Sequence, residues 1–182
     1  IKKDANTFKI YTLQGGFKAK TVISATGTWG NPSIPKLEGI EDFKGLQIHS
    51  GKYKSPKDFT GLKTLVVGEG NSGAQIVAEV SKVTAVKWST KKEPEFLPDE
   101  VDGYYLFNVA SARYKAEKEV KPFDAAQFNL GNIVMVPSVK EAQHRGVLVS
   151  SGTFDKLYDK GVIWHNGDKE EFDAIIWCTG FG

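Results

Sequence analysis

A glycine-rich turn between a strand-like and a helix-like segment constrains this chain more than any other feature. Residues 63–67 have the pattern of a buried strand, and the turn Gly68-Glu69-Gly70-Asn71-Ser72-Gly73 follows directly. Apolar residues then recur at helical spacing over 74–82, and a second strand-like segment covers 84–90. We therefore predict a strand–helix–strand unit that opens a parallel sheet.

The turn has glycine at each position where a bound dinucleotide needs one. Gly68 permits the tight turn, Gly70 lets the backbone approach a pyrophosphate, and Gly73 lets the helix pack close to the strand. The helix N-terminus then offers free N–H groups and a positive dipole end to the phosphates. Asn71 and Ser72 either bond the phosphates or serve as ordinary capping residues. Because a strand precedes the turn and a helix follows it, the motif predicts a dinucleotide site.

The end of the second strand indicates which nicotinamide cofactor is bound. An NAD site places an Asp or Glu about 20 residues after the glycine turn, to accept from the ribose 2′-hydroxyl. Here Ser89, Thr90, Lys91 and Lys92 occupy that place, and no carboxylate follows before Glu93. Hydroxyls and cations suit a 2′-phosphate, so these four residues are predicted NADPH ligands. The alternative is that the lysines belong to a solvated loop.

The rest of the chain adds strands, a linker and helices to this unit. Residues 7–25 resemble a β-meander, with strands at 7–12 and 19–25 around a turn at 14–16. Residues 26–61 contain three prolines and six glycines and are predicted to be an interdomain linker. We expect mostly helix over 91–145, including a helix at 104–118, and strands at 161–164 and 173–178. The predicted fold class is α/β: a Rossmann-like parallel sheet with flanking helices, plus the meander.

Composition excludes several classes of protein. The chain has 182 residues, 40% of them hydrophobic, which is enough for a globular core, and its formal charge of +2 gives no reason to expect nucleic acid or a membrane as partner. Its one cysteine excludes an internal disulfide framework, a thiolate zinc cluster and a redox Cys-x-x-Cys, and favours the cytoplasm. Its longest apolar runs fall far below the ~18 residues of a membrane span. We predict no metal site.

Four titratable side chains have an ordinary interpretation beside any functional one. His49 is as easily a polar residue satisfied in a loop as a catalytic group. His165 is expected to be solvated, and so is His144. Cys178 lies in an apolar strand and is expected to behave as a small apolar residue.

A second motif precedes the glycine turn and carries a family resemblance. Phe43-x-Gly45-x-x-x-His49-x-x-x-Tyr53 matches the identifying pattern of flavin-containing monooxygenases. Two further segments agree with that family: 25–35, which is similar to its hinge, and 173–181, which is similar to its later Thr-Gly strand. The similarity covers most of the chain from Val22 onward and is weakest over 110–150. The chain therefore resembles this family.

The resemblance implies a division of the chain and a chemistry. Residues 1–60 would be the last part of an FAD domain with its hinge, and 61–182 an NADPH domain, with the flavin's glycine turn preceding Ile1. NADPH would reduce FAD, and reduced flavin would form a hydroperoxide with O2 that oxygenates a soft nitrogen or sulfur of a small-molecule substrate. The resemblance assigns His49 a catalytic role and Thr26, Gly27, Thr179 and Gly180 cofactor contacts. The chain alone is expected to be inactive, and its partners would be the remaining FAD-domain segments, with a homo-oligomer left open.

Two departures from the family refine this expectation, and two other functions stay open. Tyr53 stands where Baeyer–Villiger relatives have Trp, which leads away from ketone oxidation. Lys91 stands where many relatives have Arg, and lysine lacks the bidentate fork to phosphate, so NADPH preference is expected to be weaker. The alternatives are a flavin-dependent disulfide reductase, which the missing Cys-x-x-Cys opposes, and a non-catalytic NADPH sensor.

Overall fold

The chain forms two compact units. The computed structural model describes residues 1–25, 27, 29–98, 103–119 and 133–182. Contacts divide it into Ile1–Gly30 and Asn31–Gly182, which we call unit 1 and unit 2. The predicted assignment of 1–60 to an FAD domain and 61–182 to an NADPH domain is a statement about function, and it stays a prediction.

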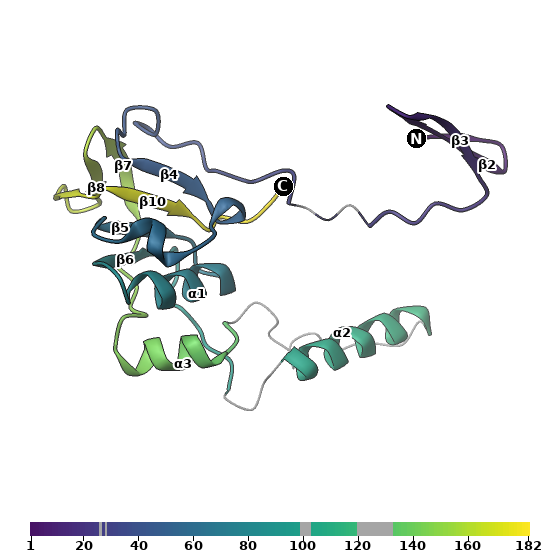
Figure 1. Ribbon diagram of the computed structural model, residues 1–182. Helices are drawn as coiled ribbons and strands as arrows, with labels where there is room; N and C mark the ends of the chain where they lie inside the picture. The colour runs from purple at the N-terminus through teal and green to yellow at the C-terminus, as the bar shows by residue number, and fades with distance from the viewer. Residues whose placement is uncertain (26, 28, 99–102, 120–132) are drawn as a thin grey trace. The chain divides into compact units, whose positions relative to one another are not determined.

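Unit 1 is a three-stranded antiparallel sheet in the order β1-β2-β3 (Figure 1). Its strands are β1 (Lys2–Asp4), β2 (Thr7–Thr12) and β3 (Gly15–Ala19). The meander is present, but the return strand predicted at 19–25 is wrong, because Thr12 already pairs with Gly15 and Phe8 with Ala19. Gly15, at a φ of 130°, lets the chain reverse after two residues. The return strand therefore ends where the sequence predicted its beginning.

Unit 2 contains a four-stranded parallel sheet in the order β4-β10-β5-β6. Its strands are β4 (Leu46–His49), β5 (Thr64–Val67), β6 (Val86–Ser89) and β10 (Ala174–Trp177). Helix α1 (Asn71–Val80) connects β5 to β6. The predicted strand–helix–strand unit and the parallel sheet of a Rossmann-like α/β fold are thereby confirmed, as is the closing strand.

The segment predicted as a linker contributes a strand to this sheet. Leu46–His49 pairs in parallel with β10 from Ala174↔Leu46 to Trp177↔His49, so the prediction of an irregular linker over 26–61 is wrong there. Two 3-10 helices follow, η1 (Ser50–Lys52) and η2 (Pro56–Phe59). The prolines and glycines that suggested a linker lie outside the four strand residues, and Ile48 packs on the core.

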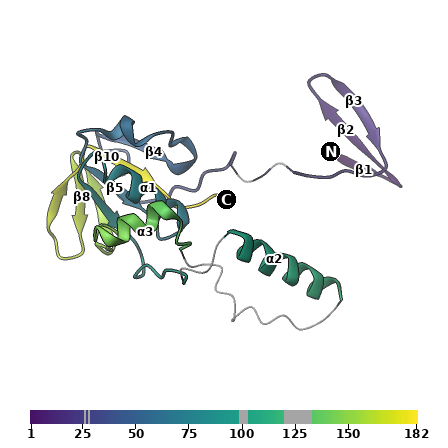
Figure 2. The same cartoon turned by 60° about the horizontal axis from the view of Figure 1, so that its bottom comes forward.

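Two apolar clusters cover the two faces of the sheet. Leu65 and Val66 are neighbours in β5 but belong to different clusters, as do Ile175 and Ile176 in β10. This alternation is the period of two that a strand imposes, and burial on both faces explains the continuous apolar pattern of a central strand. Figures 1 and 2 both show α1 beside α3 (Pro137–His144), which contacts it.

The second face is covered by a sheet that the sequence indicated only in part. Strands β7 (Phe154–Tyr158), β8 (Gly161–Trp164) and β9 (Lys169–Glu171) form an antiparallel sheet in that order. Only β8 was predicted. Helix α2 (Gly103–Lys118) matches the helix predicted at 104–118. Among the described residues, no helix is long and apolar enough to cross a membrane.

Candidate nucleotide-binding site

A cavity of about 510 Å³ lies at the carboxyl ends of three parallel strands. Residues after β5, β6 and β10 line it together with a loop segment and the start of β7: Ser33, Pro35, Leu37, Val67, Gly68, Glu69, Gly70, Ser89, Thr90, Lys91, Thr153, Phe154, Cys178 and Thr179. β10 and β6 flank β5 on opposite sides, so the chain leaves β5 in one direction and later returns on the other. In open α/β sheets this switch point is where ligands bind.

Gly68 holds the turn between the three strand ends. Its φ is +128°, and a methyl group there would stand 2.2 Å from the carbonyl oxygen of Cys178. Its N–H donates to Ser89 O at 2.9 Å, and its carbonyl accepts from Trp88 Nε1 at 2.7 Å. Only glycine combines this φ with this close approach.

The other two glycines of the turn have different surroundings. A methyl group at Gly73 would stand 2.2 Å from the carbonyl oxygen of Gly68, so helix α1 packs directly on the turn. Gly70 precedes α1 as its N-cap, with φ −90°, and a methyl group there would meet no atom within 4 Å. A phosphate fits this open space at a helix N-terminus, and its binding there stays a prediction.

Asn71 does not cap the helix, so the capping alternative for its side chain is wrong. Its Oδ1 accepts from the N–H of Val134 at 2.8 Å, which ties the segment before α3 to the first turn of α1. Ser72 is exposed on that turn, and Gly70 has no side chain with which to cap. The first turn of α1 also carries no acidic residue, which leaves its positive end available to an anion.

The hydroxyls at the end of β6 are engaged within the protein. Ser89 is 2% exposed and its Oγ donates to Gly152 O at 2.8 Å. Thr90 is 3% exposed, and its Oγ1 lies 2.6 Å from both Lys92 O and Ser150 Oγ. Both side chains therefore hold neighbouring loops together, a role that the sequence did not indicate. Their contact with a 2′-phosphate stays a prediction.

A carboxylate does lie at the end of β6, although the sequence segment there contains none. Glu69 Oε2 accepts the backbone N–H of Lys91 at 3.0 Å and that of Lys92 at 3.2 Å. The two lysine side chains are exposed, and Lys91 lines the cavity. The sequence at the end of the second strand does not indicate Glu69, because this carboxylate comes from the turn after the first strand.

His49, predicted to be catalytic, has both ring nitrogens bonded to the backbone. It is 3% exposed, Nδ1 accepts from Gly51 N–H at 3.1 Å, and Nε2 lies 2.9 Å from Gly180 O. Since Nδ1 accepts, Nε2 carries the proton and donates it to that carbonyl, which fixes a neutral tautomer. The contacts give His49 a positioning role at the Thr-Gly turn, and a catalytic role stays a prediction.

The residues of the two predicted Thr-Gly cofactor contacts belong to different units. The Oγ1 of Thr179 donates to Ser33 O, and Ser33 N–H donates to Gly180 O at 3.0 Å, so this turn is fixed at the end of β10. Gly27 is exposed in unit 1 with φ +64°. Thr26 lies outside the described residues. Cofactor binding by all four stays a prediction.

Cys178, at the cavity wall, should make the free energy of unfolding decrease as the pH rises into the alkaline range. Burial raises the pKa of its thiol to about 12, an effect that a hydrogen bond with Ser50 only partly opposes. In the unfolded chain the thiol loses its proton above pH ~8.5, whereas the folded protein retains it. The unfolded state then binds fewer protons, so the free energy of unfolding falls by about 1 kcal/mol between pH 8.5 and 9.5.

This prediction is checked by urea unfolding at pH 7.5 and 9.5 of the wild type and of Cys178→Ala. The comparison concerns the change with pH within each protein, so any baseline loss from the substitution cancels. Between these two pH values the wild type should lose about 1.4 kcal/mol more than the variant. Equal losses would contradict a protonated buried thiol.

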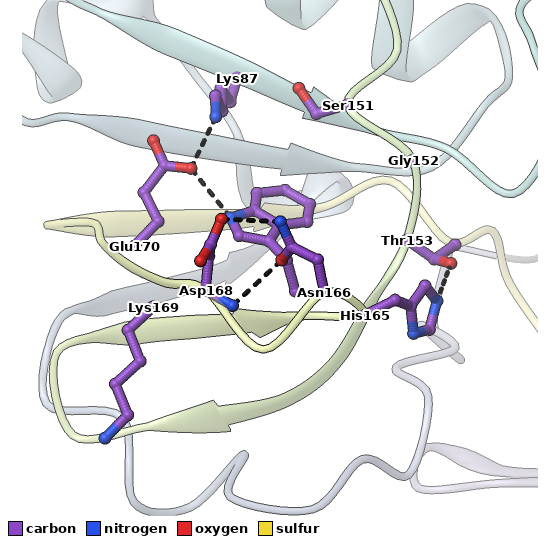
Figure 3. Close-up of a pocket in the computed structure, with 10 residues that line it drawn as sticks. Lys87, Ser151, Gly152, Thr153, His165, Asn166, Asp168, Lys169 and Glu170 are labelled. Atoms are coloured by element: carbon purple, nitrogen blue, oxygen red, sulfur yellow. Dashed lines mark hydrogen bonds and ion pairs between the residues drawn. The ribbon is translucent and has the colours of Figure 1, made fainter.

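A second pocket, of about 640 Å³, lies beside β8 and β9 (Figure 3). Glu170 bonds Lys87 at 2.6 Å, Lys63 at 2.9 Å and Trp164 Nε1 at 2.9 Å. Burial alone would raise the pKa of Glu170, but these bonds outweigh it and lower the pKa. Two charged residues of this pocket, Glu170 and Lys87, are thus already paired, which leaves it weaker than the strand-end cavity as a ligand site.

His165, at the rim of the second pocket, was expected to be solvated. It is exposed, but its Nε2 lies 2.6 Å from Thr153 Oγ1 and its Nδ1 contacts Asp155 Oδ1, so it is also paired. His144 is exposed at the end of α3, as expected. Among the described residues, no group of three or more His, Cys, Asp and Glu side chains could hold a metal ion.

The fold and the glycine turn define a Rossmann-like α/β protein. A family model described as "pyridine nucleotide-disulphide oxidoreductase" matches residues 1–121, and the chain belongs to this family. The resemblance to flavin-containing monooxygenases is confirmed as well. The family of flavin monooxygenases uses FAD and NADPH.

Three relatives illustrate the similarity. An "uncharacterized oxidoreductase CzcO-like" of Geobacillus kaustophilus is 37% identical over 100% of this chain and 52% of its own length. "Senecionine N-oxygenase" of Tyria jacobaeae is 27% identical over 97% of this chain and 29% of its own length. The solved flavin-containing monooxygenase from Stenotrophomonas maltophilia is 39% identical over 99% of this chain and 48% of its own length, with a TM-score of 0.81. The chain thus spans about half the length, or less, of these relatives.

Proposed function

We propose that unit 2 binds NADPH in the strand-end cavity, as part of an FAD-dependent monooxygenase that oxygenates a soft nitrogen or sulfur of a small molecule. One observation carries the proposal. The cavity lies at the switch point of a parallel sheet, and the open space at Gly70 adjoins the N-terminus of α1. The residues present therefore fit a dinucleotide, with the pyrophosphate beside Gly70.

The chain's own residues would bind and orient the nucleotide. The first-turn N–H groups of α1 would bond the pyrophosphate, and the Lys91 and Lys92 ammonium groups would attract a 2′-phosphate. His49 would keep the Thr179–Gly180 turn in place through its bond to Gly180 O. When bound, FAD would accept the hydride of NADPH and supply the oxygen chemistry.

The names of two relatives support oxygenation at nitrogen. They are "senecionine N-oxygenase" and "dimethylaniline monooxygenase [N-oxide-forming] 2", the latter 29% identical over 96% of this chain in Macaca mulatta. Other relatives carry names with different substrates, such as "indole-3-pyruvate monooxygenase YUCCA1" of Oryza sativa. The substrate class therefore stays a proposal, as do a cytoplasmic location, a homo-oligomer and association with further FAD-domain segments.

A disulfide reductase is the second candidate, because the matching family model carries that description. Its reaction needs a pair of redox cysteines, whereas these 182 residues contain one cysteine, Cys178. This residue is buried directly after β10, and its thiol pKa is raised. A buried, protonated thiol is a poor nucleophile. The monooxygenase is therefore the favoured function.

The proposal predicts that the Lys91→Ala/Lys92→Ala pair loses affinity for NADPH but not for NADH. Removing two exposed cations beside a 2′-phosphate should raise the NADPH dissociation constant about tenfold, a screened value for charge-assisted bonds at a surface. Titrations of both nucleotides against the full chain measure the ratio. The exposed pair Lys54→Ala/Lys57→Ala, which changes the charge equally away from the cavity, is the control.

Two results would count against the proposal. A wild-type chain that binds neither nucleotide would overturn nucleotide binding altogether. An unchanged ratio in the Lys91→Ala/Lys92→Ala pair would show that these lysines belong to a solvated loop, and the 2′-phosphate assignment would lose its physical basis.

A further inference from the structure

The carboxylate of Glu69 bridges the two strand ends that form the nucleotide cavity. Glu69 follows β5 in the glycine turn, whereas Lys91 and Lys92 follow β6, and both Glu69 and Lys91 line the cavity. One oxygen, Glu69 Oε2, accepts the backbone N–H groups of both lysines, at 3.0 and 3.2 Å. Among the described residues that follow β6, none provides a carboxylate that accepts from these two N–H groups.

The two N–H groups form an anion site that the protein's own Glu69 carboxylate occupies. Two successive backbone N–H groups directed at one point form a concavity that binds an anionic oxygen. The ammonium groups on the same two residues add positive charge around it. Glu69 is exposed to solvent, so its carboxylate can leave this position at moderate cost when another anion competes for the N–H groups.

The two nicotinamide nucleotides would meet this carboxylate differently. A ribose 2′-hydroxyl can donate a hydrogen bond to it, as it does to the acidic residue of an NAD site. A 2′-phosphate must either displace the carboxylate from the N–H groups or accept its repulsion. The same side chain therefore assists one nucleotide and opposes the other.

We propose that Glu69 is a specificity-determining residue that narrows the preference for NADPH over NADH by occupying the 2′-phosphate position at Lys91 and Lys92. The inference rests on the proposed function, because it requires that the cavity binds the nucleotide in the stated orientation. The preference between NADPH and NADH would then depend on a residue in the turn after β5, whereas the sequence pattern places its determinants at the end of β6.

The test is Glu69→Gln in the full chain. Glutamine keeps an oxygen that can accept from the two N–H groups but removes the charge, so the loop should hold its place. The probes are adenosine 2′,5′-bisphosphate and adenosine 5′-monophosphate, which differ by the 2′-phosphate alone, and then NADPH and NADH. The bisphosphate should bind about tenfold tighter than to the wild type, while the monophosphate changes less than about twofold.

Two further variants keep the test decisive. Glu41→Gln, at an exposed glutamate that does not line the cavity, makes the same charge change elsewhere and should leave the affinity ratio unaltered. Glu69→Ala removes the acceptor as well, so it should also favour the bisphosphate. Thermal unfolding of each variant checks that the fold is retained.

The possible failures are distinguishable. If the wild type binds both probes and Glu69→Gln leaves their affinity ratio unchanged, the inference about Glu69 is wrong and the proposed function stands. An equal shift in Glu41→Gln would attribute the effect to net charge, which also overturns the inference. If the wild type binds no adenine nucleotide at all, the proposed function itself fails.

Discussion

Replacing Gly68 by alanine is expected to lower the free energy of unfolding by about 3–5 kcal/mol. A φ of +128° is costly for alanine, and the added methyl group would stand 2.2 Å from the carbonyl oxygen of Cys178. That oxygen belongs to the backbone, so β5 and β10 would have to separate at their ends. Strain and overpacking each cost about 1–3 kcal/mol, against a total stability of about 5–15 kcal/mol.

Urea unfolding monitored by tryptophan fluorescence measures this loss. Gly146→Ala is the matched control, because Gly146 has a φ of +72° but no atom within 4 Å of an added methyl group. It should lose only about 1 kcal/mol, the cost of the backbone conformation alone. Equal losses in the two variants would mean that the strand ends relax around the methyl group added at Gly68 without strain, contrary to the close approach in the structure.

The part of the fold that the sequence predicts well is local. Strand β5, the glycine turn, helix α1 and strand β6 follow one another directly, so each element's period and punctuation are visible within a short window. The glycine-rich motif also predicts a strand before it and a helix after it. The proposed nucleotide site could therefore be placed from sequence at the carboxyl end of β5.

The elements that the sequence did not predict depend on distant partners. Strand β4 has only four residues, and its register is set by β10, where Trp177 pairs with His49. Without that partner, the surrounding prolines and glycines resemble a linker. Strands β7 and β9 are also short, and each is defined by its pairing with one edge of β8.

The site residues that were missed act across strands. Trp88 Nε1 donates to Gly68 O. A tryptophan in a predicted buried strand could have indicated such a bond, because a buried indole N–H usually has a hydrogen-bond partner. Glu69 was visible within the glycine turn, but its contact with the β6 end appears only when the two strands are adjacent. Ser89 and Thr90 face loop residues 150–152, whose position the sequence pattern does not reveal.

Replacing Gly70 by alanine should have the opposite effect to the Gly68 substitution. Gly70 has a φ of −90°, which alanine adopts readily, and an added methyl group meets no protein atom within 4 Å. The stability should therefore change by less than about 1 kcal/mol, the usual range at an N-cap. The methyl group would instead enter the space proposed for the pyrophosphate and raise the dissociation constants of NADPH and NADH alike, by about 50-fold.

Titration of both nucleotides, together with urea unfolding, separates the two glycines. Because the lost contact lies at the pyrophosphate, which the two nucleotides share, their affinity ratio should stay constant while both affinities fall. This distinguishes Gly70→Ala from Glu69→Gln, which should change the ratio. A stable Gly70→Ala protein that binds both nucleotides as tightly as the wild type would show that no pyrophosphate passes this turn, even if the cavity binds another part of the nucleotide.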